Sequence, residues 1–170
     1  MGTSAQHTVI AAWRAAGESG DAAAAGACLA ADVELISPLT GKFRFRGPGE
    51  VTEVLSAAFE IIRDIRYHTE LGDDRTRALF SFGVAGREPL EEAQLLRLDD
   101  DGRIRELTLF GRPVPALTEV MAGIGPRLLR RQKRAGLARV VGFATAPLNA
   151  MTRLGDRRLV PLADPRRRRG

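Results

Sequence analysis

The stretch WRAAGESGDAAAAGACLAADVELISP, residues 13–38, sets the expected architecture of this chain. Its first part continues an apolar pattern at helical spacing, which predicts a helix over residues 7–17. Gly20 and Asp21 break this helix, and Asp21 is a suitable N-cap for the alanine-rich run that follows. The last part alternates between apolar and polar residues, which predicts a strand that ends at Ser37.

The chain that follows predicts one more helix and then a series of strands. An apolar stripe that includes Phe59 predicts a helix over residues 50–63. Alternating residues and glycine turns predict strands, over residues 42–46, 65–71, 76–84, 91–98 and 103–110. Helices first and an antiparallel meander afterwards indicate an α+β fold, in which a curved antiparallel sheet wraps around the N-terminal helices.

Composition limits the class of protein. A length of 170 residues with 44% hydrophobic content suits one domain with a real core plus an appendage. The sequence has no apolar run of 18 or more residues, so no membrane-spanning helix is expected, and its start does not resemble a signal peptide. Cys28 is the only cysteine, which excludes an internal disulfide and fits a reducing cytoplasm.

The charges are distributed unevenly along the chain. Residues 1–126 carry 13 basic and 19 acidic side chains, whereas residues 127–170 carry 13 basic and 2 acidic ones. Such asymmetry is typical of an acidic body and a basic tail with separate roles.

The block 13–38, matched without a gap, resembles the opening unit of the ketosteroid isomerases. The later Asp-Gly-Arg-Ile at 101–104, followed by Leu-Phe-Gly at 109–111, resembles the last hairpin of that family. The family belongs to the wider nuclear-transport-factor-2-like (NTF2-like) or SnoaL-like superfamily, which includes polyketide cyclases. The resemblance implies a cone-shaped domain over residues 1–115, with an apolar interior, and a basic, partly helical extension over residues 116–170.

The resemblance also assigns positions to the polar groups of the cavity. In the ketosteroid isomerases one carboxylate shuttles a proton, while a tyrosine and a neutral carboxylic acid donate hydrogen bonds. The resemblance places Trp13 at the tyrosine, Ser37 at the shuttling carboxylate and Gln94 at the neutral acid. None of these three side chains can abstract a proton unaided. Together with Phe59 they suit the binding of a small apolar ligand, such as a steroid-, polyketide- or terpenoid-like molecule.

Two other functions stay open. An isomerase- or cyclase-type enzyme would need another base in the cavity, and Glu92 and His68 are the candidates. Glu92 shares a strand face with Gln94, and burial would raise its pKa. Histidine is the residue type best suited to act as a base near neutral pH, but His68 shares a face with the charged Arg66 and Glu70. The third possibility is a non-catalytic dimeric scaffold whose cavity is filled by its own side chains; Trp13 also fits a plain core position.

No cofactor or metal is expected. Two histidines far apart and one cysteine do not form a ligand set, and no glycine-rich phosphate loop is found.

The extension combines arginines with an apolar helical stripe. Residues 127–134 are strongly basic, and apolar residues recur at helical spacing over 137–151. We expect these helices to pack over the cone or across a homodimer. The alternative is that residues 127–158 bind an anionic membrane surface or an acidic partner. Nucleic-acid binding is not expected, because aromatic side chains are not interleaved with the arginines.

Overall fold

The computed structural model describes residues 2–165, so the expected extension falls within it except for residues 166–170. Five helices are present: α1 (Gly2–Ser19), α2 (Ala22–Ala27), α3 (Gly47–Phe59), α4 (Val114–Arg131) and α5 (Ala135–Arg158). A 3₁₀ turn follows at Val160–Ala163. The strands are β1 (Leu29–Ile36), β2 (Phe45–Arg46), β3 (Ile62–Gly72), β4 (Thr76–Ala85), β5 (Glu88–Leu98) and β6 (Ile104–Arg112).

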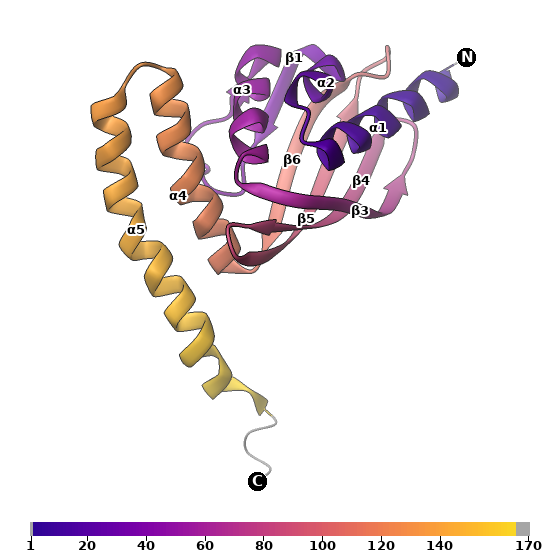
Figure 1. Ribbon diagram of the computed structural model, residues 1–170. Coiled ribbons are helices and arrows are strands. Elements are labelled where there is room, and N and C mark those ends of the chain that lie inside the picture. The colour runs from indigo at the N-terminus through magenta and orange to yellow at the C-terminus, as the bar shows by residue number, and fades with distance from the viewer. Residues whose placement is uncertain (1, 166–170) are drawn as a thin grey trace.

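The strands form one open, curved sheet, with helices α1, α2 and α3 over one face (Figure 1). Its strand order is β2-β1-β6-β5-β4-β3. This confirms the α+β fold, with one correction: the sheet is mixed, because β1 pairs with β6 in parallel. After β1 the chain crosses over through α3 and enters the sheet again at its far edge. The meander then brings β6 back beside β1 in the same direction.

Sequence periodicity predicts the inner face of the sheet well. Asp21 caps α2 as expected, because its carboxylate accepts hydrogen bonds from the amides of Ala23 and Ala24. Alternate residues of β1, β4, β5 and β6 pack with the helices into one core, which includes Ile10, Trp13, Val33, Leu35, Val51, Leu79, Leu96 and Leu107. This core, contributed by both layers, forms the walls of the cone.

Strand β3 departs from the expected alternation because it contains a bulge. Tyr67 lies opposite Ser81, but Thr69 lies opposite Phe80, so His68 is an extra residue on this strand. Beyond the bulge the two faces exchange. Leu71, expected on the same face as Tyr67, is therefore 59% exposed.

The C-terminal helices form a hairpin beside the cone (Figure 1). Helix α4 runs through Pro126, and its Ala116 and Val120 pack against Ala85 and Leu90 of the sheet. Helix α5 packs on α4 and extends past it, away from the sheet. The expectation that the apolar stripe of 137–151 packs over the cone is wrong, because most of its larger side chains are exposed.

Candidate functional site

A narrow cavity lies between the N-terminal helices and the inner face of the sheet. Its volume is about 40 Å³. A buried water needs roughly 10–15 Å³ on this measure, so the cavity has room for a few waters. Most of its wall is apolar, with contributions from Leu55, Ala58, Phe59, Ile62, Ile65, Leu90 and Leu109. The polar part of the wall is concentrated in a few side chains that hydrogen-bond to one another.

These polar side chains form a connected chain. The indole N–H of Trp13 donates to Oε1 of Gln94 at 2.8 Å, and the Tyr67 hydroxyl donates to the same oxygen at 3.2 Å. The amide nitrogen of Gln94 donates to Oε1 of Glu92 at 2.6 Å. Because an indole N–H can only donate, the amide oxygen of Gln94 must face Trp13. The amide nitrogen is thereby directed at Glu92.

Local structure explains how these groups meet. Glu92 and Gln94 are two residues apart on β5, so both side chains point to the inner face. Tyr67 is the last residue of β3 before the bulge and also faces inward. The Glu18 carboxylate accepts a hydrogen bond from the Tyr67 amide at 3.0 Å, which ties α1 to β3.

Gly17 makes room for the tyrosine. A Cβ atom at this position would lie 2.7 Å from the Tyr67 hydroxyl oxygen, which is closer than real Cβ contacts allow. The absence of a side chain on this turn of α1 therefore lets the phenol reach Gln94.

The cavity shifts the acid–base properties of two of its groups. Burial raises the pKa of the Glu92 carboxyl, and the hydrogen bond from Gln94 opposes this in part. Burial also raises the pKa of the Tyr67 phenol, and the nearby Glu92 carboxylate adds to the effect. Tyr67 therefore stays protonated and acts as a donor. The pKa of Glu92 is higher than that of an ordinary glutamate.

Four of the sequence-predicted site residues come together at the cavity: Trp13, Phe59, Glu92 and Gln94 all line it. Trp13 and Gln94 are only 2% and 7% exposed. The indole N–H of Trp13 donates to Gln94, so Trp13 offers the cavity its ring and not its N–H.

Ser37 and His68 lie elsewhere. Ser37 follows β1, and its hydroxyl accepts a hydrogen bond from the Leu39 amide at 3.2 Å in a local turn. It is not part of the cavity wall. His68 stands on the opposite face of the sheet, where its ring stacks on Phe82 with centroids 4.4 Å apart. The bulge in β3 turns it outward, away from the interior.

Tyr67 is the functional candidate that sequence reasoning missed. It is the only tyrosine of the chain, and its alternation with Ile65 already indicated an inward side chain. The sequence does not show that Tyr67 contacts Gln94, and this contact is what makes Tyr67 part of the site. Within residues 2–165, no group of three or more His, Cys, Asp or Glu side chains is arranged to hold a metal ion.

Comparison with known proteins identifies the fold. No protein-family model and no curated protein sequence matches the chain. Among solved structures, it is similar to a steroid delta-isomerase from Pseudomonas aeruginosa at 25% identity and a TM-score of 0.69, over 75% of this chain and 94% of that one. The chain therefore has the fold of the NTF2-like/SnoaL-like proteins.

Two further structures support this assignment. A protein with a cystatin-like fold from Silicibacter pomeroyi matches at 23% identity and a TM-score of 0.71, over 79% of this chain and 96% of that one. A SnoaL-like protein from Burkholderia thailandensis matches at 16% identity and a TM-score of 0.54, over 65% of this chain and 97% of that one. An NTF2-like cone with a partly polar cavity is a fold suited to binding small ligands.

Proposed function

We propose that this NTF2-like chain binds a small, largely apolar molecule with one carbonyl or hydroxyl group, and that Glu92 exchanges a proton with it. The observation that carries the proposal is the Glu92 carboxyl, which ends a hydrogen-bond chain inside a mostly apolar cavity. Steroid-, polyketide- and terpenoid-like molecules have this combination of a large apolar surface and few polar groups.

The geometry supports proton transfer at Glu92 in particular. A general acid or base works best when its pKa lies near the working pH, and burial moves Glu92 in that direction. The amide of Gln94 holds one carboxylate oxygen. No other hydrogen bond to this carboxylate is found among the described residues, so the second oxygen is available to a ligand.

The cavity must widen to accept such a ligand. Pockets for drug-sized molecules are roughly 300–1,000 Å³, far above the 40 Å³ found here. Phe59 contributes to the wall and keeps part of its surface exposed. A shift of this side chain would open the cavity while leaving the chain from Trp13 to Glu92 in place.

Tryptophan fluorescence tests the binding step, since Trp13 is the only tryptophan and lines the cavity. The protein is titrated with a panel of steroid ketones, aromatic polyketides and terpenes. We expect a saturable change with at least one ligand class. Ligands that respond are then assayed for isomerisation and for exchange of the protons next to their carbonyl group with deuterated water.

A matched pair of variants separates binding from catalysis. Glu92→Gln is expected to keep the saturable fluorescence change and to slow proton exchange by about 100-fold or more, the usual contribution of a general acid or base. Ser37→Ala is expected to change neither, because Ser37 is not part of the cavity wall. If Glu92→Gln binds the ligand and still exchanges its protons at the wild-type rate, the catalytic role of Glu92 is overturned.

A non-catalytic scaffold is the second candidate, and the small cavity volume favours it. Trp13 is buried in either case, so a blue-shifted emission does not distinguish the two functions. A panel in which no ligand produces a saturable change would support the scaffold.

A further inference from the structure

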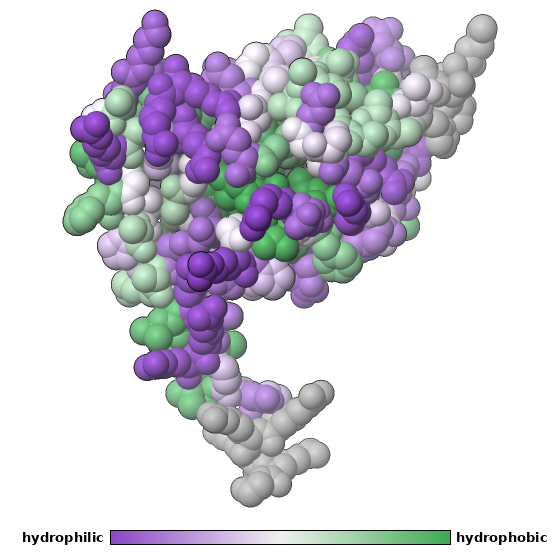
Figure 2. Space-filling view, viewed as in Figure 1, coloured by the Kyte–Doolittle hydropathy of each residue, from purple (hydrophilic) through white to green (hydrophobic). Residues whose placement is uncertain are grey.

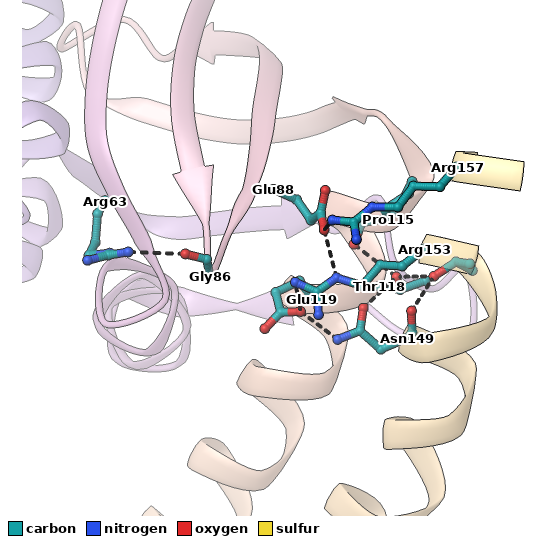
Figure 3. A network of polar contacts seen from close by, with 10 residues as sticks. Arg63, Gly86, Glu88, Pro115, Thr118, Glu119, Asn149, Arg153 and Arg157 are labelled. Atoms are coloured by element: carbon teal, nitrogen blue, oxygen red, sulfur yellow. Dashed lines mark hydrogen bonds and ion pairs between the residues drawn. The ribbon is translucent and has the colours of Figure 1, made fainter. Parts of the chain in front are cut away.

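Helix α5 has an unusual distribution of side chains: Asn149 and Arg153 face the protein, whereas most of its large apolar residues face solvent. Asn149 and Arg153 point toward α4 and β5 (Figure 3). The Asn149 amide contacts Glu119 and Thr118, and the Arg153 guanidinium donates to Glu88 at 2.7 Å. The contact between α4 and α5 is therefore largely made by polar and small residues.

The opposite side of α5 carries its large apolar residues. Val140, Phe143, Met151 and Leu154 are 62%, 84%, 69% and 53% exposed. Their spacing of three, eight and three residues keeps them on one side of the helix. Figure 2 shows hydrophobic side chains along the free edge of the hairpin, with hydrophilic ones gathered at its turn. In a water-soluble helical hairpin the apolar side of each helix normally faces the protein and the polar side faces solvent.

The apolar side is uncharged and is bordered by arginines. Residues 140–152 contain no Asp, Glu, Lys or Arg. Arg139 stands directly before this stretch, and Arg157 and Arg158 follow it in the last turn of the helix. All three are exposed. An uncharged apolar strip between basic side chains matches the boundary between acyl chains and anionic headgroups of a bilayer.

The charges argue against a dimer in which a second copy of the hairpin buries the apolar side of α5. Residues 127–165 carry nine basic side chains and only two acidic ones, Asp156 and Asp164. Four of the basic side chains are paired with carboxylates of the body: Arg127 and Arg131 with Glu60, and Arg153 and Arg157 with Glu88. Whether two α5 helices met in parallel or antiparallel fashion, arginines would face arginines, and such contacts are repulsive.

We propose that the outer side of α5 is a docking surface for an anionic lipid bilayer. Val140, Phe143, Met151 and Leu154 enter the interface while Arg139 and Arg158 contact lipid phosphates. The helix lies along the surface and does not cross it. Within the described part of the chain, every helix is too short or too polar to span a bilayer. The polar contacts of Asn149 and Arg153 hold the hairpin to the cone, which then rests beside the membrane.

Vesicle flotation of the full-length protein tests this proposal. Vesicles of phosphatidylcholine alone are compared with vesicles containing phosphatidylglycerol in addition. We expect the protein to float with the anionic vesicles at least tenfold more strongly than with the neutral ones, and added salt to reduce the bound fraction. No flotation with anionic vesicles, or equal flotation with both kinds, would overturn the proposal.

Three variants locate the surface. Phe143→Ser with Met151→Ser removes apolar area from the proposed side, and we expect at least a tenfold loss of binding to anionic vesicles. Arg139→Ala with Arg158→Ala is expected to reduce binding to anionic vesicles without affecting any residual binding to neutral ones. Phe110→Ser is the matched control, because this side chain is 54% exposed on the outer face of the sheet and is not part of α5 or of the cavity wall. It is expected to bind like wild type.

Two measurements keep the variants interpretable. Circular dichroism establishes that the exposed substitutions leave the helices folded. Light scattering reports the oligomeric state, and a dimer that Phe143→Ser with Met151→Ser dissociates would show that a second copy covers α5, which overturns the proposal. Unchanged flotation of that double variant would overturn it as well.

Discussion

The molecule contains two polar networks with opposite surroundings. In the cone, Trp13, Tyr67, Gln94 and Glu92 bond to one another inside an apolar wall. In the C-terminal hairpin, the polar contacts between α4 and α5 are inside (Figure 3). The large apolar side chains of α5 are exposed to solvent instead. The first arrangement is typical of a ligand site in a water-soluble fold. The second is typical of a structure whose outer side contacts an apolar partner, such as the lipid bilayer proposed for α5.

The largest expected effect is in the cone. Gln94→Leu removes the acceptor of both the Trp13 N–H and the Tyr67 hydroxyl. A buried donor without a partner costs about 1–3 kcal/mol, so we expect a loss of about 2–6 kcal/mol in the free energy of unfolding. Urea denaturation measures it.

A double-mutant cycle sharpens this result. Tyr67→Phe deletes one donor and keeps the ring, so it should destabilise the protein less in the Gln94→Leu background than in wild type. Equal effects in both backgrounds would mean that the cone network does not act as a unit.

The next largest effect is at the hairpin. The Glu88 side chain is 13% exposed and accepts a hydrogen bond from Arg153, which fastens α5 to β5. Glu88→Gln is expected to weaken this attachment by about 2 kcal/mol, which is the strength of a hydrogen bond to a charged group. Hydrogen exchange of the α5 amides should accelerate accordingly while the sheet is unaffected.

Its matched control is Glu91→Gln, since Glu91 pairs with Arg112 on the exposed side of the same strand. Exposed pairs contribute about 0–1 kcal/mol, so this variant should leave α5 exchange unchanged. Equal acceleration in both variants would show that the hairpin is not held by Glu88.

The third effect depends on pH. Burial raises the folded-state pKa of Glu92, so the unfolded chain ionises at this residue before the folded protein does. The contribution of Glu92 to stability is complete below its unfolded-state value near 4.5 and is lost as the pH rises through the folded-state pKa. The Glu92→Gln variant should therefore become more stable relative to wild type as the pH increases from about 4. Denaturation of both proteins across this range measures the difference, and a constant difference would contradict it.

The smallest expected effect is at Ser37. Its hydroxyl accepts one hydrogen bond, from Leu39, in a local turn. Ser37→Ala is expected to cost about 0.5–1 kcal/mol and to leave ligand binding unchanged. A loss of ligand response in this variant would show that the cavity reaches further toward β1 than the structure indicates.

Sequence and structure agree where periodicity decides the outcome. Alternation along β5 correctly placed Glu92 and Gln94 on one inner face, and the break at Gly20 and Asp21 correctly separated the first two helices. The agreement ends where a local irregularity intervenes. The bulge at His68 reverses the faces of β3, and no residue type in that segment announces it.

The pairing of functional groups was also beyond the sequence. Tyr67 and Gln94 are far apart in the chain, and their contact depends on the register between three neighbouring strands. The orientation of α5 was predicted wrongly for a related reason. Its apolar stripe was expected to pack over the cone or across a homodimer, whereas hydrogen bonds and ion pairs from Asn149 and Arg153 turn the opposite side of the helix toward the cone.

The central claim is that the cone network ends in a buried carboxyl suited to proton transfer. Its most direct test is the pKa of Glu92, measured by ¹³C NMR titration of the side-chain carboxyl, with Glu92→Gln to assign the signal. We expect a midpoint clearly above the ordinary value of 4.5. A midpoint at or below 4.5 would show a solvated or charge-stabilised carboxylate, and would contradict the proposed role of Glu92.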